Sequence, residues 1–472
     1  MDEDLLYLRD NVLPDAVARL NAQLSSASAF VMRRSARSIS ASKTVNVGRA
    51  EVTPDWRQNI EAVVIRVSDG RSMHSRYTEE VTPDGIMQVT NALLSEVSMS
   101  GTFCLPERSS EVFVYDTPVE QPLAEVSLAD KIRHTRQLRE RCMQEKNVVS
   151  ASIAYKEVDT QEVYVDAERR LAQHIPIARI LGGIYVSGKT QSPTFNRIYQ
   201  GCHGFESLMI SDEAIAEAVD IARRMHMPIP VPTDKRISVI TDPSHTGTIA
   251  HEACGHPREG DTATYGLAGA MKYIGKMFGS RFVTLVTDPT RPGFGHYAFD
   301  HEGSIAEKVV LVDKGILTNE MITDRLSAYY GGFRETAHGR RQDPAHLLMS
   351  RQSYTGFEAA PLEEGGISVD EMVAHVEDGL LICGSYGGME DPFGLTVQVN
   401  SLYGKEIKSG KWTGNITRFV KLDGLVPELL SSVTAVSCKS EVRPGGCGKW
   451  HKEYVSVGDG GPYLLFENVR VA

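Results

Sequence analysis

Two histidines, a carboxylate and a thiol lie within the six residues HEACGH, from His251 to His256. Imidazole nitrogen and thiolate sulfur are preferred zinc ligands, and a glutamate beside such a pair is the general base of many metalloproteases. In the common HExxH helix the histidines are four residues apart and share one face. Here they are five apart, so a regular helix rotates by about 500° between them and leaves them roughly 140° apart. The motif predicts a metal site only if the helix is locally irregular.

Two irregularities would bring the histidines together. A single π-type turn absorbs one extra residue and is common at functional sites. Alternatively the helix ends, and Gly255 lets the backbone swing His256 round. Pro257 favours the second, because proline disfavours α geometry at the residue before it. Without either, the two histidines are an incidental pair on a buried helix.

A zinc site with catalytic chemistry needs a third protein ligand and one open position. Cys447 lies among glycines in RPGGCGKW, which indicates a loop rather than a packed element. Cys254 is the rival, although its position on the helix is typical of a core thiol. A cysteine nucleophile at either position, with a histidine base, is a further alternative.

The stretch around the motif, ITDPSHTGTIAHEACGHPREGD, indicates a strand, a turn and a helix, with Ser244 or Thr246 as the helix cap. A second helix is predicted over 368–379, where Ser368 and Glu371 have capping-box spacing and Gly379 marks the end. The rest of this half consists of short strand-like runs between Gly, Asp and Pro, which indicate a mainly antiparallel barrel or sandwich. These runs are RISVITD, RFVTLVTD, KVVLVDKGIL, LTVQVNSLYG, GNITRFVKLDG and PYLLFENVRVA.

The first half alternates between strand-like and helical sequence patterns. Residues 61–70 indicate a strand, and helical spacing is found over 84–97, 127–142 and 211–226. The proline-rich MPIPVPTDK that follows cannot continue a helix and marks a domain boundary near Pro230. The predicted fold class is α+β, with an N-terminal α/β domain (1–230) followed by a mainly antiparallel β domain (231–472) that carries the HExxxH helix.

Composition excludes several functions. The chain has 472 residues and a formal net charge of −11, which makes it a poor partner for nucleic acid. No apolar run is long enough to span a membrane, and the acidic N-terminus lacks the apolar stretch of a secretory signal. The seven scattered cysteines do not form a disulfide framework and fit a reducing compartment. We expect a cytoplasmic protein without nucleic-acid or membrane partners.

Four stretches, in order, resemble the TldD/PmbA family of metallopeptidases, in particular its metal-bearing TldD-like branch. They cover about 240 residues, and the N-terminal half is compatible with the family but more weakly similar. HExxxH alone is only suggestive, whereas all four segments in family order are specific. The segments are HEACGHPREGD, FDHEGSIAEKVVLVDKGILTNEMITDRLSA, GRRQDPAHLLMSR and RPGGCGKWHKEYVSVGDGGPYLLFENVRV.

The resemblance implies one zinc ion held by His251, His256 and Cys447, with Glu252 as the general base that activates a zinc-bound water. It implies a peptidase that cleaves short or unfolded peptides in a narrow cleft. It also implies a dimer, formed either by two copies or with a homologous subunit that lacks the metal motif. Binding of zinc to Cys447 displaces a proton, so affinity should fall in acid.

This sequence departs from the family pattern near the motif. His301 stands where a second acid is common, and the segment after Cys447 is bulkier than usual and contains His451. Both histidines are candidates to line the substrate cleft, the alternative being ordinary loop residues. Arg340 and Arg341 are candidates to clamp a peptide carboxylate, the alternative being pairing with local acids. The glycine-rich segment 384–394 would allow an extended peptide to approach the backbone closely.

Two other functions are compatible with these residues. One is a zinc amidohydrolase that acts on a small amide or peptide intermediate of a biosynthetic pathway. The other is a non-catalytic partner subunit of a TldD-like complex, against which the intact HExxxH motif and Cys447 argue.

Overall fold

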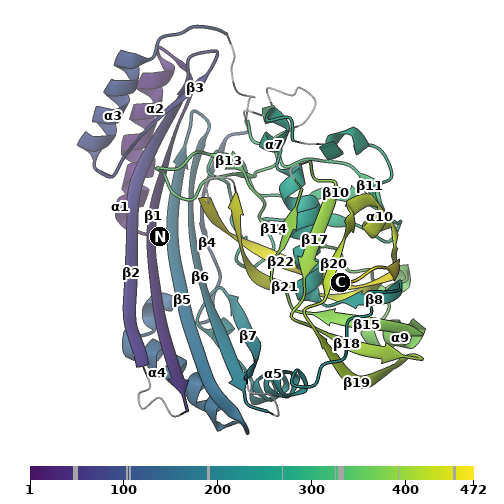
Figure 1. Ribbon diagram of the computed structural model, residues 1–472. Coiled ribbons are helices and arrows are strands. Elements are labelled where there is room, and N and C mark those ends of the chain that lie inside the picture. The colour runs from purple at the N-terminus through teal and green to yellow at the C-terminus, as the bar shows by residue number, and fades with distance from the viewer. Residues whose placement is uncertain are drawn as a thin grey trace.

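The computed structural model describes residues 1–45, 51–102, 105, 108–188, 192–267, 269–324, 326–327, 334–391, 393–449 and 453–472. Figure 1 shows a tall sheet of long strands on one side, built from the N-terminal half, and a second body of shorter strands packed beside it. This arrangement confirms the α+β fold class.

The first half forms a seven-stranded sheet in the order β3-β2-β1-β5-β6-β4, and β7 pairs with the remaining length of β6. All pairs are antiparallel except β4 with β6. The strands are β1 (Ser25–Thr44), β2 (Glu51–Ser68), β3 (Met73–Thr78), β4 (Glu111–Asp116), β5 (Val148–Val165), β6 (Arg169–Val186) and β7 (Thr194–Cys202).

Helices pack on this sheet through apolar faces of helical spacing. Leu5, Leu13, Val17 and Leu20 form one core with the strands, and Leu138 contributes to a second. The predicted helices over 84–97, 127–142 and 211–226 are present. The helices are α1 (Glu3–Tyr7), which continues through the π-helical η1 (Leu8–Val12) into α2 (Leu13–Asn21), and α3 (Pro83–Glu96), α4 (Leu128–Gln144) and α5 (Asp212–Arg224).

The second half is built around a ten-stranded sheet in the order β11-β10-β9-β14-β22-β8-β15-β18-β19, with β21 also paired to β22. The sheet is mixed, because β14 pairs parallel to β22 and β8 parallel to β15. Its strands are β8 (Ile237–Thr241), β9 (Leu285–Thr287), β10 (Val309–Asp313), β11 (Ile316–Leu317), β14 (Tyr354–Phe357), β15 (Asp378–Cys383), β18 (Tyr403–Lys408), β19 (Lys411–Arg418), β21 (Val433–Lys449) and β22 (Glu453–Val469).

Two small sheets accompany it. One pairs β12 with β13, and the other has the order β16-β17-β20. Their strands are β12 (Gly339–Arg340), β13 (Met349–Ser350), β16 (Gly388–Glu390), β17 (Thr396–Asn400) and β20 (Lys421–Leu425). The helices of this half are α6 (Pro243–Ala250), α7 (Asp261–Thr264), α9 (Val369–His375) and α10 (Val426–Ser431).

The predicted helix over 368–379 is α9, and its capping box between Ser368 and Glu371 is present. The helix ends at His375, however, and Gly379 lies in β15 instead of marking the helix end. Val376 already has extended backbone angles, because the chain must enter β15 to pair with β8 and β18.

Buried ion pairs connect the two halves. The Arg66 guanidinium of β2 donates to Glu302 and to Asp324, each at 2.6 Å, and both carboxylates are fully buried. Such pairs require close geometry to offset the loss of hydration, so they fix the orientation of one half against the other. The boundary near Pro230, between α5 and β8, stays a prediction. Among the described residues, no helix has the length and apolarity needed to cross a membrane.

Candidate metal centre

The helix that carries the HExxxH motif begins earlier than either cap predicted from the sequence. Asp242, not Ser244 or Thr246, is the N-cap of α6, and its carboxylate accepts a hydrogen bond from the His245 amide at 2.8 Å. Pro243 occupies the first helical position, where its missing N–H is not needed. α6 packs closely on β22, because Gly247 lies against the Gly460 backbone, where a side chain would clash.

A π turn brings the two histidines together. It spans His251–Gly255, and the His256 amide donates to the His251 carbonyl five residues earlier. The expectation that Gly255 would end the helix is wrong: Gly255 and His256 keep right-handed helical angles, and Pro257 starts a short 3-10 turn. A Cβ at Gly255 would lie 2.1 Å from the Gln352 side-chain oxygen, so a larger residue there would displace the Gln352 side chain.

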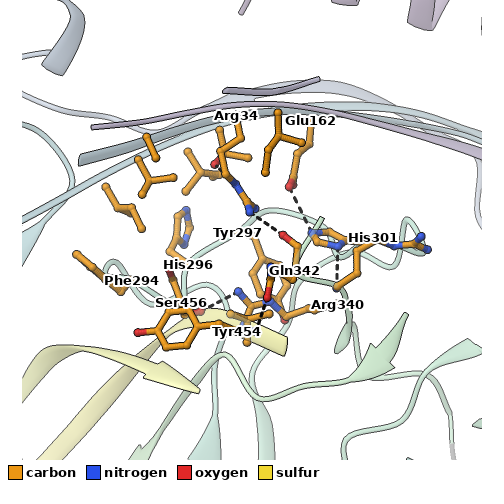
Figure 2. Close-up of a pocket in the computed structure, with 18 of the residues that line it drawn as sticks. Arg34, Glu162, Phe294, His296, Tyr297, His301, Arg340, Gln342, Tyr454 and Ser456 are labelled. Atoms are coloured by element: carbon orange, nitrogen blue, oxygen red, sulfur yellow. Dashed lines mark hydrogen bonds and ion pairs between the residues drawn. The ribbon is translucent and has the colours of Figure 1, made fainter. Parts of the chain in front are cut away.

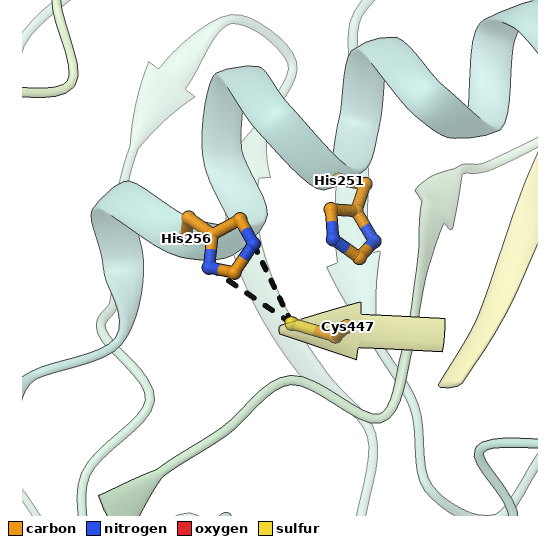
Figure 3. Close-up of side chains that lie close together, drawn as sticks. All are labelled: His251, His256 and Cys447. Carbon is orange, nitrogen blue, oxygen red and sulfur yellow. Dashed lines mark hydrogen bonds between the residues drawn. The ribbon is translucent and has the colours of Figure 1, made fainter. Parts of the chain in front are cut away.

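The thiol of Cys447 contacts the imidazole of His256 and lies near that of His251 (Figure 3). Its Sγ lies 3.4 Å from His256 Nε2, and donor atoms of His251, His256 and Cys447 all lie within 4.8 Å of one another. The expected loop position of Cys447 is wrong, because the residue is near the end of β21, paired with Val455 of β22 and 1 % exposed. The glycines beside it are therefore part of a strand.

Each histidine is oriented by a carboxylate on its other nitrogen. His251 Nδ1 lies 2.9 Å from Asp459 Oδ1, and His256 Nδ1 lies 3.2 Å from Glu259 Oε2. Both contacts use Nδ1, and in His256 the other nitrogen, Nε2, is the one nearer to the thiol. A carboxylate in this position fixes the ring and increases the basicity of the ligating nitrogen.

The charged groups of the metal centre shift one another's pKa values. Burial alone would lower the pKa of both histidines, but Asp459 raises the pKa of His251 well above its ordinary value, and Cys447 and Glu259 raise that of His256 to about 10. Burial would raise the pKa of Cys447, but His256 and His251 hold it well below the usual range. The thiol is therefore favoured as the thiolate, which is the form that binds metal.

Two tests on the geometry support a zinc ion at this centre. Two imidazoles and one thiolate are the soft and borderline donors that zinc prefers. Tetrahedral bonds of about 2.1 Å to nitrogen and 2.3 Å to sulfur would separate the N and S atoms by about 3.6 Å. The observed separation of 3.4 Å is close to this value. With three protein donors, one position of the tetrahedron is left for a solvent molecule or a substrate.

Glu252 lies next to this centre and faces a second acid, Glu390 of β16. Oxygen atoms of both carboxylates and a nitrogen of His256 lie within 4.8 Å of one another. Burial and the contact with Glu390 raise the pKa of Glu252 to about 8, against the opposing effect of His251. Gly388 allows this approach, since a Cβ there would lie 2.7 Å from Glu252 Cγ.

The metal centre opens into a cleft of about 750 Å³ between the two halves. His251 and Glu252 line it from one side and strand β7 from the other. The glycine-rich segment contributes Gly384 and Gly387. A volume of this size lies within the range that is typical of ligand-binding clefts.

The other predicted substrate residues lie elsewhere. Arg340, Arg341 and His301 line a separate cavity behind the β21–β22 ribbon, not the metal cleft. His301 is buried, 3.3 Å from Glu162, and stacks on Phe30. His451 lies outside the described residues.

Several residues around the predicted metal ligands could not be predicted from the HExxxH motif. Asp459 and Glu390 come from strands far along the chain, and Arg351 donates to Cys447 Sγ at 3.2 Å. Glu259 offered the best clue, because it follows the second histidine by three residues in HPREGD. Cys254, the rival ligand, is fully buried in the apolar core, and burial raises its pKa to about 12.

Comparisons with known proteins identify the family of the chain. The family model of the PmbA/TldA metallopeptidase C-terminal domain matches residues 234–472. A metalloprotease from Methanothermobacter thermautotrophicus is 29 % identical over 328 residues, which cover 69 % of this chain and 70 % of the relative. A zinc metalloprotease TldD homolog from Saccharolobus solfataricus is 25 % identical over 235 residues, or 49 % of this chain and 51 % of the relative.

The crystal structure of TldE from Thermococcus kodakarensis has the same fold, with a TM-score of 0.75 over 98 % of this chain and all of that one, at 17 % identity. The class that the fold and the relatives define is the metallopeptidases. The matched domain is just over half of the chain, and the chain belongs to the PmbA/TldD family.

Proposed function

We propose that the protein is a zinc-dependent peptidase that hydrolyses peptide bonds of small or unfolded peptides. The observation that carries the proposal is the convergence of His251, His256 and Cys447, whose donor atoms lie within 4.8 Å of one another beside the buried acid Glu252. A structural zinc site would be closed by a fourth protein ligand, whereas three donors next to an acid and a cleft suit catalysis.

A zinc ion bound here would polarise the peptide carbonyl and lower the pKa of water. Glu252 takes the proton from the attacking water and gives it to the leaving amine. A general base works best with a pKa near the operating pH; burial and Glu390 raise the pKa of Glu252 from its ordinary value, and a bound zinc ion would oppose this shift. Glu390 holds the Glu252 carboxyl in place and favours its protonated form after the proton is taken.

The cleft suits an extended substrate. β16 forms the outer strand of its small sheet in the described part of the chain, and it runs directly past Glu252. An extended peptide that pairs with such an edge is held by main-chain hydrogen bonds, largely independent of its sequence. Gly384 and Gly387 leave space for its backbone.

We also propose that the protein works as a dimer, either of two copies or with a homologous subunit. The support is the common fold with TldE of Thermococcus kodakarensis, a related chain of nearly the same extent. Light scattering on the protein purified from its own host, with identification of any chain that co-purifies, distinguishes the two forms. A monomer with full peptidase activity would contradict the proposal.

The test of the peptidase is the variant Glu252→Gln, which keeps the size of the side chain and removes the base. We expect unchanged zinc content and a loss of kcat/KM on an unfolded peptide of about 10²- to 10⁴-fold. Glu364→Gln, at an exposed position of a surface turn, is the control. Wild-type activity in the Glu252→Gln protein would refute the role of this residue, and the absence of zinc from an active protein would refute the proposal.

A further inference from the structure

A second cavity lies between the tall sheet and the C-terminal half, with a volume of about 240 Å³ (Figure 2). Strands β1, β2, β5 and β6 form its roof, and residues 294–301, residues 340–342 and the start of β22 form its floor. It is separate from the metal cleft, with which it shares no lining residue. Nothing in the proposed chemistry uses it.

The cavity concentrates positive charge in a protein with a net charge of −11. Four of its lining residues are basic, namely Arg34, Lys156, Arg340 and Arg341. Only two are acidic, and both are already engaged. Glu162 lies 3.3 Å from His301 and accepts a hydrogen bond from Gln173 at 2.6 Å. Asp300 accepts hydrogen bonds from three backbone amides, those of Glu302, Ser304 and Gly339.

Two of the cations are hydrogen-bonded to neutral groups, although Glu162 and Asp343 also act electrostatically on Arg34. Arg34 donates to the Gln342 carbonyl at 2.6 Å and to Thr160 at 3.3 Å. Arg340 donates to two further backbone carbonyls, those of Gln352 and Ser456. Lys156 has no ion-pair partner in the described part of the chain, and burial together with the nearby guanidinium groups lowers its pKa. The cavity therefore presents charge that an anion would neutralise.

Another part of the cavity lining is apolar. Ile175, Ile177 and Phe294 pack together there, and Val158 lies beside them. Inorganic anions gain nothing from such a wall, whereas an organic anion with an apolar side chain buries it. Sites for drug-sized ligands have volumes of about 300–1,000 Å³, so this cavity has room for one amino-acid residue rather than a long chain.

The cavity adjoins the metal centre through one ribbon. Val455 of β22 lines the cavity and is the strand partner of Cys447. Tyr454 also lines it, and its hydroxyl covers Gly446, which faces the metal cleft. Paired strands are about 4.8 Å apart, so the cavity and the metal centre are bordered by neighbouring strands of one ribbon.

We propose that this cavity binds the C-terminal carboxylate and the apolar last side chain of a peptide substrate or product. The proposal rests on the proposed peptidase function and adds a substrate class: peptides with a free, apolar C-terminus. Lys156 and Arg34 neutralise the carboxylate, and Arg340 borders it from the floor. A guanidinium and an ammonium group suit this role because both form charge-assisted hydrogen bonds with carboxylates.

The test is direct binding to the full-length, zinc-loaded Glu252→Gln protein, which prevents turnover. Calorimetry compares N-acetyl-Ala-Ala-Leu as the free acid with its C-terminal amide. We expect the acid to bind about tenfold or more tightly, since hydrogen bonds to charged groups contribute more than neutral ones. Lys156→Met should remove most of this preference, and Lys156→Arg should keep it. Lys411→Met, which removes the same charge from an exposed position on β19, should have no effect.

Three results would overturn the proposal. One is equal affinity for acid and amide in the protein with Lys156 intact. Another is a preference that survives Lys156→Met, since it would then arise at the zinc ion itself. The third is binding of N-acetyl-leucine or inorganic phosphate as tight as that of the peptide, which would assign the cavity to a free small anion. Failure of the peptidase proposal is recognised separately, because it would appear as hydrolysis that does not depend on zinc or Glu252.

Discussion

Asp459 should control how tightly the centre holds zinc without being a ligand itself. Its Oδ1 lies 2.9 Å from His251 Nδ1, and its side chain is 21 % exposed. Loss of such an outer carboxylate typically weakens metal binding by about 10- to 100-fold, or about 1.4–2.7 kcal/mol. Asp459→Asn still offers an oxygen to the imidazole and removes only the charge. We therefore expect about a tenfold weaker zinc affinity for Asp459→Asn, and a larger effect for Asp459→Ala.

The assay is competition for zinc against a fluorescent chelator of known affinity at fixed pH. Asp313→Asn, at an exposed position of β10, is the matched control and should bind zinc like the wild type. Thermal unfolding of the metal-free proteins shows whether the fold is intact. A zinc affinity of Asp459→Asn within twofold of wild type, in a folded protein, would refute the argument that this carboxylate supports His251.

Two further predictions concern residues outside the donor set. Cys254→Ala should keep zinc and peptidase activity, because the thiol only packs in the apolar core. The free energy of unfolding should fall by roughly 0.5–3 kcal/mol. Loss of activity in a folded, zinc-loaded variant would support a nucleophilic cysteine instead. His174 lies 2.9 Å from Asp159 and 2.8 Å from Asp116, and these carboxylates outweigh burial and raise its pKa. The contribution of His174 to the free energy of unfolding should be complete below about pH 6.5 and be lost as the pH rises through its raised pKa. Urea unfolding at several pH values should therefore show a smaller pH dependence for His174→Gln than for the wild type.

Sequence patterns predict the helices of this fold well where the signals for a helix lie within or next to that helix. The capping box at Ser368 and the helical spacing of α3, α4 and α5 are local signals, and they hold. The contact of Gly255 with the Gln352 side chain could not be predicted from the sequence, because the two residues lie far apart along the chain. Cys447 lies in a strand because its ribbon pairs with β22 despite three neighbouring glycines.

The candidate ligands are visible in the sequence, but their surroundings are not. His251 and Asp459 are separated by 208 positions, and no spacing rule links them. Arg340 and Arg341 have the right chemistry for a carboxylate, yet only the folded chain shows that they line a different cavity from the metal cleft. The residue types therefore predict which ligands and charges are present, and only the fold shows which of them lie together.

X-ray absorption at the zinc edge of the purified, zinc-loaded protein tests the central claim most directly. Two nitrogen atoms at about 2.0–2.1 Å and one sulfur atom at about 2.3 Å are expected, together with one lighter atom from solvent. The sulfur signal should disappear in Cys447→Ser and persist in Cys254→Ala. A zinc shell without sulfur in the wild-type protein, or one that keeps its sulfur in Cys447→Ser, would contradict the assignment of His251, His256 and Cys447 as the metal ligands.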